Sequence, residues 1–238
     1  MGFVRGDASA CVFHHPQCEA TTSAHGDDFT TCGSKLQLDW FKQQLEKKYE
    51  PTEQCRLGPG ANDHKGRKIL NRIIRWTDRG IEYEANPRQT ETVVDELTLV
   101  GAKTVGTPGV KASAGATASD EDLELHQHTA FRGVAARCNY LAADRPDIQF
   151  SAKETCRWMA KPSKQGLAAL KRFGRYLEGH QRLVLHYPQY AEVVDVYSDT
   201  DWAGCLRTRR STSGGLLDAG EASDQVLELH PGRDSIEF

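Results

Sequence analysis

Apolar residues that recur every three or four positions predict a helix early in the chain. The stripe consists of Leu38, Phe41, Leu45 and Tyr49. Ser34 and Gln37 have the spacing of a capping box, in which each side chain accepts a hydrogen bond from the other residue's backbone N–H. We therefore expect a helix of about 14 residues that begins after Ser34 and ends before Pro51.

Short extended runs surround this helix. Residues 9–15, 20–24 and 29–32 have the β-branched and aromatic content of strands, and residues 69–76 and 80–84 predict two more strands. A short helix is expected over 90–99. The stretch 101–122 consists largely of Gly, Ala, Thr and Ser, a composition with little to bury, so it predicts a linker or long loop.

Helical periodicity returns after this stretch in three segments that follow one another closely. Residues 131–142 place Phe131, Val134, Ala135, Cys138, Leu141 and Ala142 on one face. A second stripe runs through Ile148, Ala152, Cys156 and Met159, and a third, capped by Ser163, through Leu167, Leu170, Gly174 and Leu177. Residues 182–187 and 192–199 then alternate like two strands of one new sheet. The periodicity fades from about residue 216, and we expect residues 220–238 to be a disordered tail.

The composition indicates the cellular compartment of the protein and shows that its charged residues are unevenly distributed along the chain. The 238 residues include no apolar run long enough for a membrane helix and no signal-peptide core. Seven cysteines without regular spacing indicate reduced thiols, so we expect an intracellular protein of the cytoplasm or the nucleus, with no membrane partner. Residues 144–182 hold nine Lys or Arg against four acids, although the net charge is −3. A basic region of this kind favours a polyanionic partner.

Two sets of carboxylates are candidates for metal binding or catalysis. Asp27 and Asp28 lie at the tip of a predicted hairpin, where adjacent like charges either form an ordinary turn or bind cations such as Mg²⁺. Asp195, Asp199 and Asp201 alternate along a predicted strand, which is also the pattern of a solvent-exposed face. The run Cys11-x-x-His14-His15-x-x-Cys18 offers four zinc-type ligands. Because Cys11 and His14 would point to opposite faces of a strand, we prefer hairpin residues to a zinc site there.

Several segments, in order, resemble the Pol polyprotein of copia-type retrotransposons. Residues 10–32 are similar to the end of the reverse transcriptase palm, and Thr107-Pro108 is similar to a marker that precedes the connection region. The most specific match is the run Phe131-Arg-Gly-Val-Ala-Ala-Arg-Cys-Asn-Tyr-Leu-Ala-Ala-Asp-Arg-Pro-Asp-Ile148. It continues through Leu170–Gly179 and ends with Tyr197–Cys205 and Arg209–Gly215, which resemble the start of a ribonuclease H domain.

The resemblance implies an α+β fold that consists of a polymerase palm hairpin, thumb and connection helices, and the first strands of a ribonuclease H-like sheet. It divides the chain into the palm end and thumb (1–100), a flexible linker (101–128), a helical connection region (129–188), a truncated ribonuclease H start (189–217) and a disordered tail (218–238). Asp27 and Asp28 would be palm metal ligands, and Asp199 the first ribonuclease H carboxylate. Asp201 is expected to support its turn.

The implied activity is RNA-directed DNA synthesis with Mg²⁺ or Mn²⁺, and the implied partners are an RNA template, a DNA primer, an RNA–DNA hybrid and other parts of the same polyprotein. The residues implied to contact nucleic acid are Lys164, Lys171, Arg172 and Arg175, unless they form only a solvated helix face. Because the fingers, the first palm aspartate and the later ribonuclease H carboxylates find no match, we expect the chain to be inactive in isolation. The alternatives are a non-enzymatic nucleic-acid-binding remnant and a decayed open reading frame.

Overall fold

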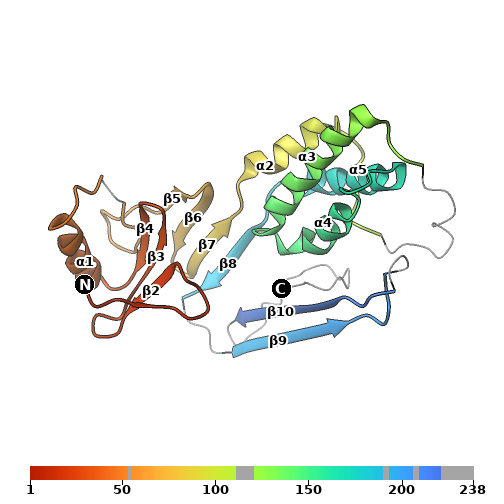
Figure 1. Cartoon of the computed structure of the whole chain (residues 1–238). Helices are drawn as coiled ribbons and strands as arrows, with labels where there is room; N and C mark the ends of the chain where they lie inside the picture. The colour runs from red at the N-terminus through yellow and green to blue at the C-terminus, as the bar shows by residue number, and fades with distance from the viewer. Residues whose placement is uncertain (53–54, 111–120, 190–192, 206–208, 221–238) are drawn as a thin grey trace. The chain divides into compact units, whose positions relative to one another are not determined.

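The chain divides into two compact units, residues 1–55 and 56–238 (Figure 1). The computed structural model describes residues 1–52, 55–110, 121–189, 193–205 and 209–220. Both units contain antiparallel sheets, and each is described by itself below.

The first unit is a four-stranded sheet with one helix. Its strands lie in sequence order, and the bounds are β1 (Val4–Arg5), β2 (Val12–His15), β3 (Ala20–His25) and β4 (Asp28–Cys32), followed by α1 (Lys35–Glu46). The capping box is confirmed, since the Ser34 side chain accepts from the Gln37 N–H and the Gln37 side chain accepts from the Ser34 N–H. Phe41 and Leu45 are buried as expected. The helix is shorter than predicted, and the exposed Tyr49 lies beyond its end.

The second unit contains a four-stranded antiparallel sheet in the order β5 (Gly66–Ile69), β6 (Arg72–Thr77), β7 (Gly80–Glu84) and β8 (Val184–Pro188). The prediction that residues 182–187 and 192–199 share a new sheet is therefore wrong. Two contacts explain the pairing of β8 with β7 instead. Arg182 forms an ion pair with Glu84 beside the Glu84–Val184 register pair, and the rings of Tyr83 and Tyr187 meet edge to face across the two strands.

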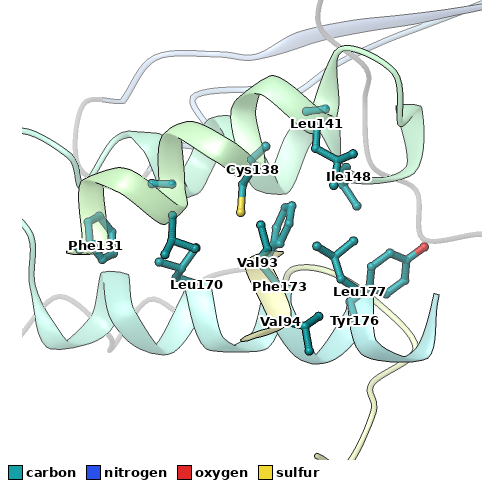
Figure 2. Close-up of a cluster of buried hydrophobic side chains, with 14 of the residues drawn as sticks. Val93, Val94, Phe131, Cys138, Leu141, Ile148, Leu170, Phe173, Tyr176 and Leu177 are labelled. Carbon is teal, nitrogen blue, oxygen red and sulfur yellow. The ribbon is translucent and has the colours of Figure 1, made fainter. Parts of the chain in front are cut away.

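The helices of this unit are α2 (Pro87–Glu96), α3 (Leu125–Ala142), α4 (Gln149–Cys156) and α5 (Lys164–Gly179), with a 3₁₀ turn at Pro146–Ile148. All six residues of the predicted α3 stripe are buried, and they form one core with side chains of α2 and α5 (Figure 2). Ser163 caps α5 by accepting the Gly166 N–H at 3.1 Å. The second predicted stripe ends early, because α4 stops at Cys156.

The predicted domain boundaries at 100 and 128 do not match the division of the chain. Val93 and Val94 of α2 belong to the same core as α3 and α5, so residues 56–100 are not a part of the first unit. The segment 97–109 is anchored rather than free, because the Thr107 hydroxyl accepts a hydrogen bond from Arg172 Nη2 at 2.8 Å. A Cβ added at Gly174 would lie 2.6 Å from Leu99 Cδ1, which shows how closely the segment approaches α5. Residues 111–120 lie outside the described part of the chain.

The last described elements, β9 (Val193–Thr200) and β10 (Ser213–Gly220), form a two-stranded antiparallel sheet. Since β10 includes residues 218–220, the tail predicted from 218 begins too early, and its remainder lies outside the described residues. None of the helices in the described ranges is long and apolar enough to span a bilayer.

Candidate functional site

Asp27 and Asp28 lie at the tip of a tight β3–β4 hairpin, as the sequence predicts. His25 pairs with Asp28, so Gly26 and Asp27 form the two-residue turn. Gly26 has φ +63°, whereas Asp27 is not among the residues with positive φ. Positive φ at the first central position alone is the pattern of the type II′ hairpin turn, which favours Gly at that position. Both aspartates are exposed.

The two aspartates supply carboxylate oxygens, the donors that Mg²⁺ prefers. A two-metal site needs more ligands than two adjacent carboxylates provide. In the described ranges, no three His, Cys, Asp or Glu side chains are grouped so that they could hold a metal ion. The hairpin therefore has the donor chemistry of a metal site, but the described residues do not complete one.

The side chains of the run Cys11-x-x-His14-His15-x-x-Cys18 are not grouped as metal ligands in the described ranges. His14 is exposed and its Nδ1 lies 3.0 Å from the Thr21 hydroxyl, whereas His15 is buried. His15 Nδ1 accepts the Cys18 N–H at 3.1 Å, and its ring packs edge to face on Phe3 and Trp40. Because the two histidines have separate surroundings, His15 serves the packing of the first unit.

Asp199 and Asp201 differ in their surroundings. Asp199 is exposed near the end of β9 and pairs with Gly214. Asp201 Oδ1 accepts the backbone N–H groups of Thr212 at 2.8 Å and of Gly204 at 3.2 Å. These bonds, that of Thr212 first, hold the pKa of Asp201 below its ordinary value. Asp201 therefore supports the turn, as expected; both carboxylates are exposed, and that of Asp201 is engaged by the turn backbone.

The four basic residues of α5 do not form one solvated face. Lys164 is exposed and forms an ion pair with the exposed Glu121, which raises the pKa of Lys164. Lys171 is exposed, but Arg172 and Arg175 are half-buried, and the Nε atoms of both are buried without a hydrogen-bond partner. The segment 97–109 packs near this end of α5, so the sequence pattern overestimates the accessible positive charge.

Two sets of polar contacts that the sequence analysis did not identify lie on the β5–β8 sheet, and the set around Asp144 joins the sheet to the helices. The Asp144 carboxylate accepts from Arg72 Nε at 2.9 Å and from the Tyr83 hydroxyl at 2.5 Å. Desolvation and this bond raise the pKa of Tyr83 to about 12. Glu84 accepts from Arg75 Nη2 at 2.6 Å and from Arg182 Nη2 at 2.8 Å. The bond from Arg182, followed by that from Arg75, lowers the pKa of Glu84.

The residues that follow Asp144 in the most specific sequence motif form a separate set of polar contacts. Arg145, which is 1% exposed, donates to Asp147 from Nε at 2.8 Å and from Nη2 at 2.6 Å. Asp147 also accepts from the Tyr176 hydroxyl at 2.9 Å, and Arg145 Nη2 donates to the His180 carbonyl. Each charged group of the motif Asp144-Arg145-Pro146-Asp147 therefore connects elements of the fold. The only indication of these contacts in the sequence was the motif itself, in which charged residues of alternating sign lie on both sides of a proline.

The chain is similar to an uncharacterized mitochondrial protein and to retrovirus-related Pol polyproteins from plant transposons. It is 36% identical over 85 residues to an uncharacterized mitochondrial protein, AtMg00810, of Arabidopsis thaliana, which is 35% of each chain. It is 32% identical over 123 residues to the retrovirus-related Pol polyprotein from transposon RE1 of the same plant, and 29% identical over 134 residues to that from transposon RE2. These matches cover 51% and 56% of this chain.

The matches cover only 8% of the RE1 polyprotein and 9% of the RE2 polyprotein, so the chain spans a small part of these relatives. No protein-family model matches the chain. No solved structure matches it either. The relatives confirm the resemblance inferred from the sequence motifs: the chain is similar to a fragment of the Pol polyproteins of copia-type retrotransposons.

Proposed function

We propose that the chain derives from the reverse transcriptase and ribonuclease H part of a Pol polyprotein, and that it does not synthesise DNA by itself. The observation that carries the proposal is the β3–β4 hairpin, which places Asp27 and Asp28 side by side at an exposed type II′-like tip. In this role, the two carboxylates are the palm ligands for Mg²⁺ or Mn²⁺. Asp199, exposed on β9, is the first carboxylate of the ribonuclease H part.

The absence of activity follows from the incomplete ligand set. Metal-dependent nucleotide transfer needs ions held in a fixed geometry that stabilises both the attacking and the leaving oxygen. The described residues provide two adjacent carboxylates at the hairpin and no grouped third ligand. Without that ligand, the ions lose both charge compensation and orientation, which supply a large share of the rate. We therefore expect polymerase activity only when another polypeptide segment completes the site.

Primer extension tests the proposal. The full 238-residue chain is incubated with poly(rA)/oligo(dT), dTTP and Mg²⁺ or Mn²⁺, with an active reverse transcriptase as the positive control. We expect incorporation by the control and none by the chain. Incorporation by the chain that the Asp27→Ala variant abolishes would overturn the claim of inactivity.

A chimera tests the role of the hairpin directly. Residues 20–32 replace the two-aspartate palm hairpin of an active reverse transcriptase, and we expect the chimera to retain activity and to lose it on Asp28→Asn. Thr30→Ser, on an exposed position of the same strand, is the matched control and should leave activity unchanged. A folded chimera that is inactive, or one that is insensitive to Asp28→Asn, would show that the hairpin is not a palm metal hairpin.

A further inference from the structure

The connection between β9 and β10 has a defined conformation in its described residues, 201–205 and 209–212, which we call the Trp202 loop. Asp201 organises it from one side through the two backbone N–H groups that its carboxylate accepts. The two limbs are also bonded to each other, since the Cys205 N–H donates to the Arg210 carbonyl at 3.2 Å and the Ala203 N–H donates to the Ser211 hydroxyl at 3.1 Å. The loop is therefore held by several hydrogen bonds.

Helix α4 contacts the loop through two cationic side chains. Lys153 Nζ donates to the Thr212 hydroxyl at 3.2 Å, and Thr212 is buried. Arg157 Nη1 donates to Cys205 Sγ at 3.0 Å. These contacts fix both limbs of the loop to a helix, so that an aromatic side chain on the loop is presented from a supported backbone.

Trp202 is 94% exposed, whereas Trp40, Trp76 and Trp158 are half-buried. Leaving an indole ring in water forgoes the stabilisation that its burial would provide, which amounts to several kcal/mol for a large aromatic surface. On the return limb, Arg209 and Arg210 are exposed as well. The loop thus combines an available aromatic face with two guanidinium groups.

We propose that the Trp202 loop binds single-stranded nucleic acid, with Trp202 stacking on one base and Arg209 and Arg210 contacting the flanking phosphates. An aromatic platform bordered by cations is the chemistry that recognises unpaired bases without sequence preference. A base inside a duplex offers no free face, so a single strand is the expected ligand. The inference deepens the proposed function and rests on it for the nucleic-acid partner.

Asp199 limits where the strand can lie. Its exposed carboxylate precedes Trp202 by three residues and repels phosphate, whereas the Asp201 carboxylate is engaged by the backbone N–H groups of Thr212 and Gly204. The strand therefore passes on the side of Arg209 and Arg210. In buffer without divalent ions, Asp199→Asn is expected to strengthen binding.

Fluorescence anisotropy with fluorescein-labelled oligo(U) and oligo(dT) 12-mers at several salt concentrations measures this binding. We expect Trp202→Ala to weaken the affinity about tenfold, as loss of one base–aromatic stack does, and Trp202→Phe to restore most of it. Arg210→Ala should also reduce the slope of log K against log salt by about 0.7, the value for one phosphate contact on a single strand. The two oligonucleotides separate an RNA ligand from a DNA ligand.

Tyr140→Ala and Arg88→Ala, exposed residues on α3 and α2, are the matched controls and should change the affinity less than twofold. The proposal is overturned if the chain binds neither oligonucleotide, if Trp202→Ala binds within twofold of the parent, or if duplex DNA competes as well as a single strand. A loss on Lys171→Glu without a loss on Trp202→Ala would assign the binding to α5 instead. Primer extension tests Asp27 and Asp28 and does not depend on Trp202. A failure of the proposed function can therefore be distinguished from a failure of the Trp202 proposal.

Discussion

The ion pair between Arg145 and Asp147 is expected to be the most sensitive polar contact in the second unit. Arg145 is 1% exposed, and its guanidinium is bonded to both oxygens of Asp147 and to the His180 carbonyl of the α5 C-terminus. Replacing it by Met keeps an unbranched apolar stem but leaves the Asp147 carboxylate, whose side chain is 9% exposed, without its cation. Removal of one partner of a buried ion pair costs about 3–5 kcal/mol.

Hydrogen exchange of the α5 amides in the full chain measures this cost. A local probe is needed because the two units can unfold in separate transitions, and a global unfolding curve would then not report on α5 alone. A loss of about 3–5 kcal/mol corresponds to exchange that is faster by roughly two to four orders of magnitude. The double variant Arg145→Met/Asp147→Leu tests the cause. Without either charge, protection should recover substantially, since apolar replacement of a whole buried pair is often neutral or stabilising.

The control is Lys161→Met, because the Lys161–Asp122 pair has side chains that are 77% and 53% exposed. Its loss should cost less than about 1 kcal/mol. The reasoning is refuted if Arg145→Met leaves exchange within threefold of the parent chain. It is also refuted if the double variant is as damaged as Arg145→Met, since the cost would then not come from the unpaired carboxylate.

Two further predictions concern the β5–β8 sheet. Because Arg182 and Arg75 lower the pKa of Glu84 in the folded chain, its ion pairs add stability that is complete above the ordinary pKa of a glutamate and is lost as the pH falls through the lower folded value. The urea midpoint of the second unit should therefore decrease as the pH is lowered from about 5 to about 3. Glu84→Gln should be less stable at pH 7, and its stability should depend less on acid pH. An unchanged acid dependence in this variant would contradict the assignment. Gly80 has φ +148°, and a Cβ there would lie 2.1 Å from the Tyr187 carbonyl oxygen, so Gly80→Ala should lower the thermal midpoint and release the β8 amides to exchange. Gly26→Ala, also at positive φ but with no atom within 4 Å of the added Cβ, is the matched control and should cost only about 1 kcal/mol; equal effects of the two variants would disprove the backbone clash.

Local features were predictable because their causes lie within a few residues. The Ser34 capping box, the Ser163 cap and the β3–β4 hairpin depend on side chains that bond to nearby backbone or on a glycine at positive φ. The α3 stripe was also predictable, because a helix that packs on a core must be apolar every three or four residues. Among the site residues, sequence reasoning located Asp27 and Asp28 at an exposed tip and Asp201 in a turn.

Predictions that needed partners distant in the sequence were incomplete or wrong. Periodicity places Arg172 and Arg175 on the polar side of α5, but cannot show that both are half-buried or that Thr107 contacts Arg172. Strand alternation in 182–187 is the same whichever strand lies beside it, so the pairing of β8 with β7 followed only from the Glu84–Arg182 ion pair and the aromatic contact. The low-complexity composition of 101–122 likewise gave no indication that the Thr107 hydroxyl is hydrogen-bonded to Arg172.

The sequence by itself determined the helices, the exposed aspartate hairpin and the relationship to copia-type Pol polyproteins, since each rests on local bonding or on an ordered series of motifs. Only the tertiary structure decided that Asp144 joins the sheet to the helices, that Arg145 and Asp147 form a pair bonded to α5, and that Trp202 is exposed on a supported loop. The physical reason is that burial and ion pairing depend on what is packed against a side chain. Arg145 and Trp202 differ most in this respect, because the charged side chain is enclosed and the aromatic one is in water.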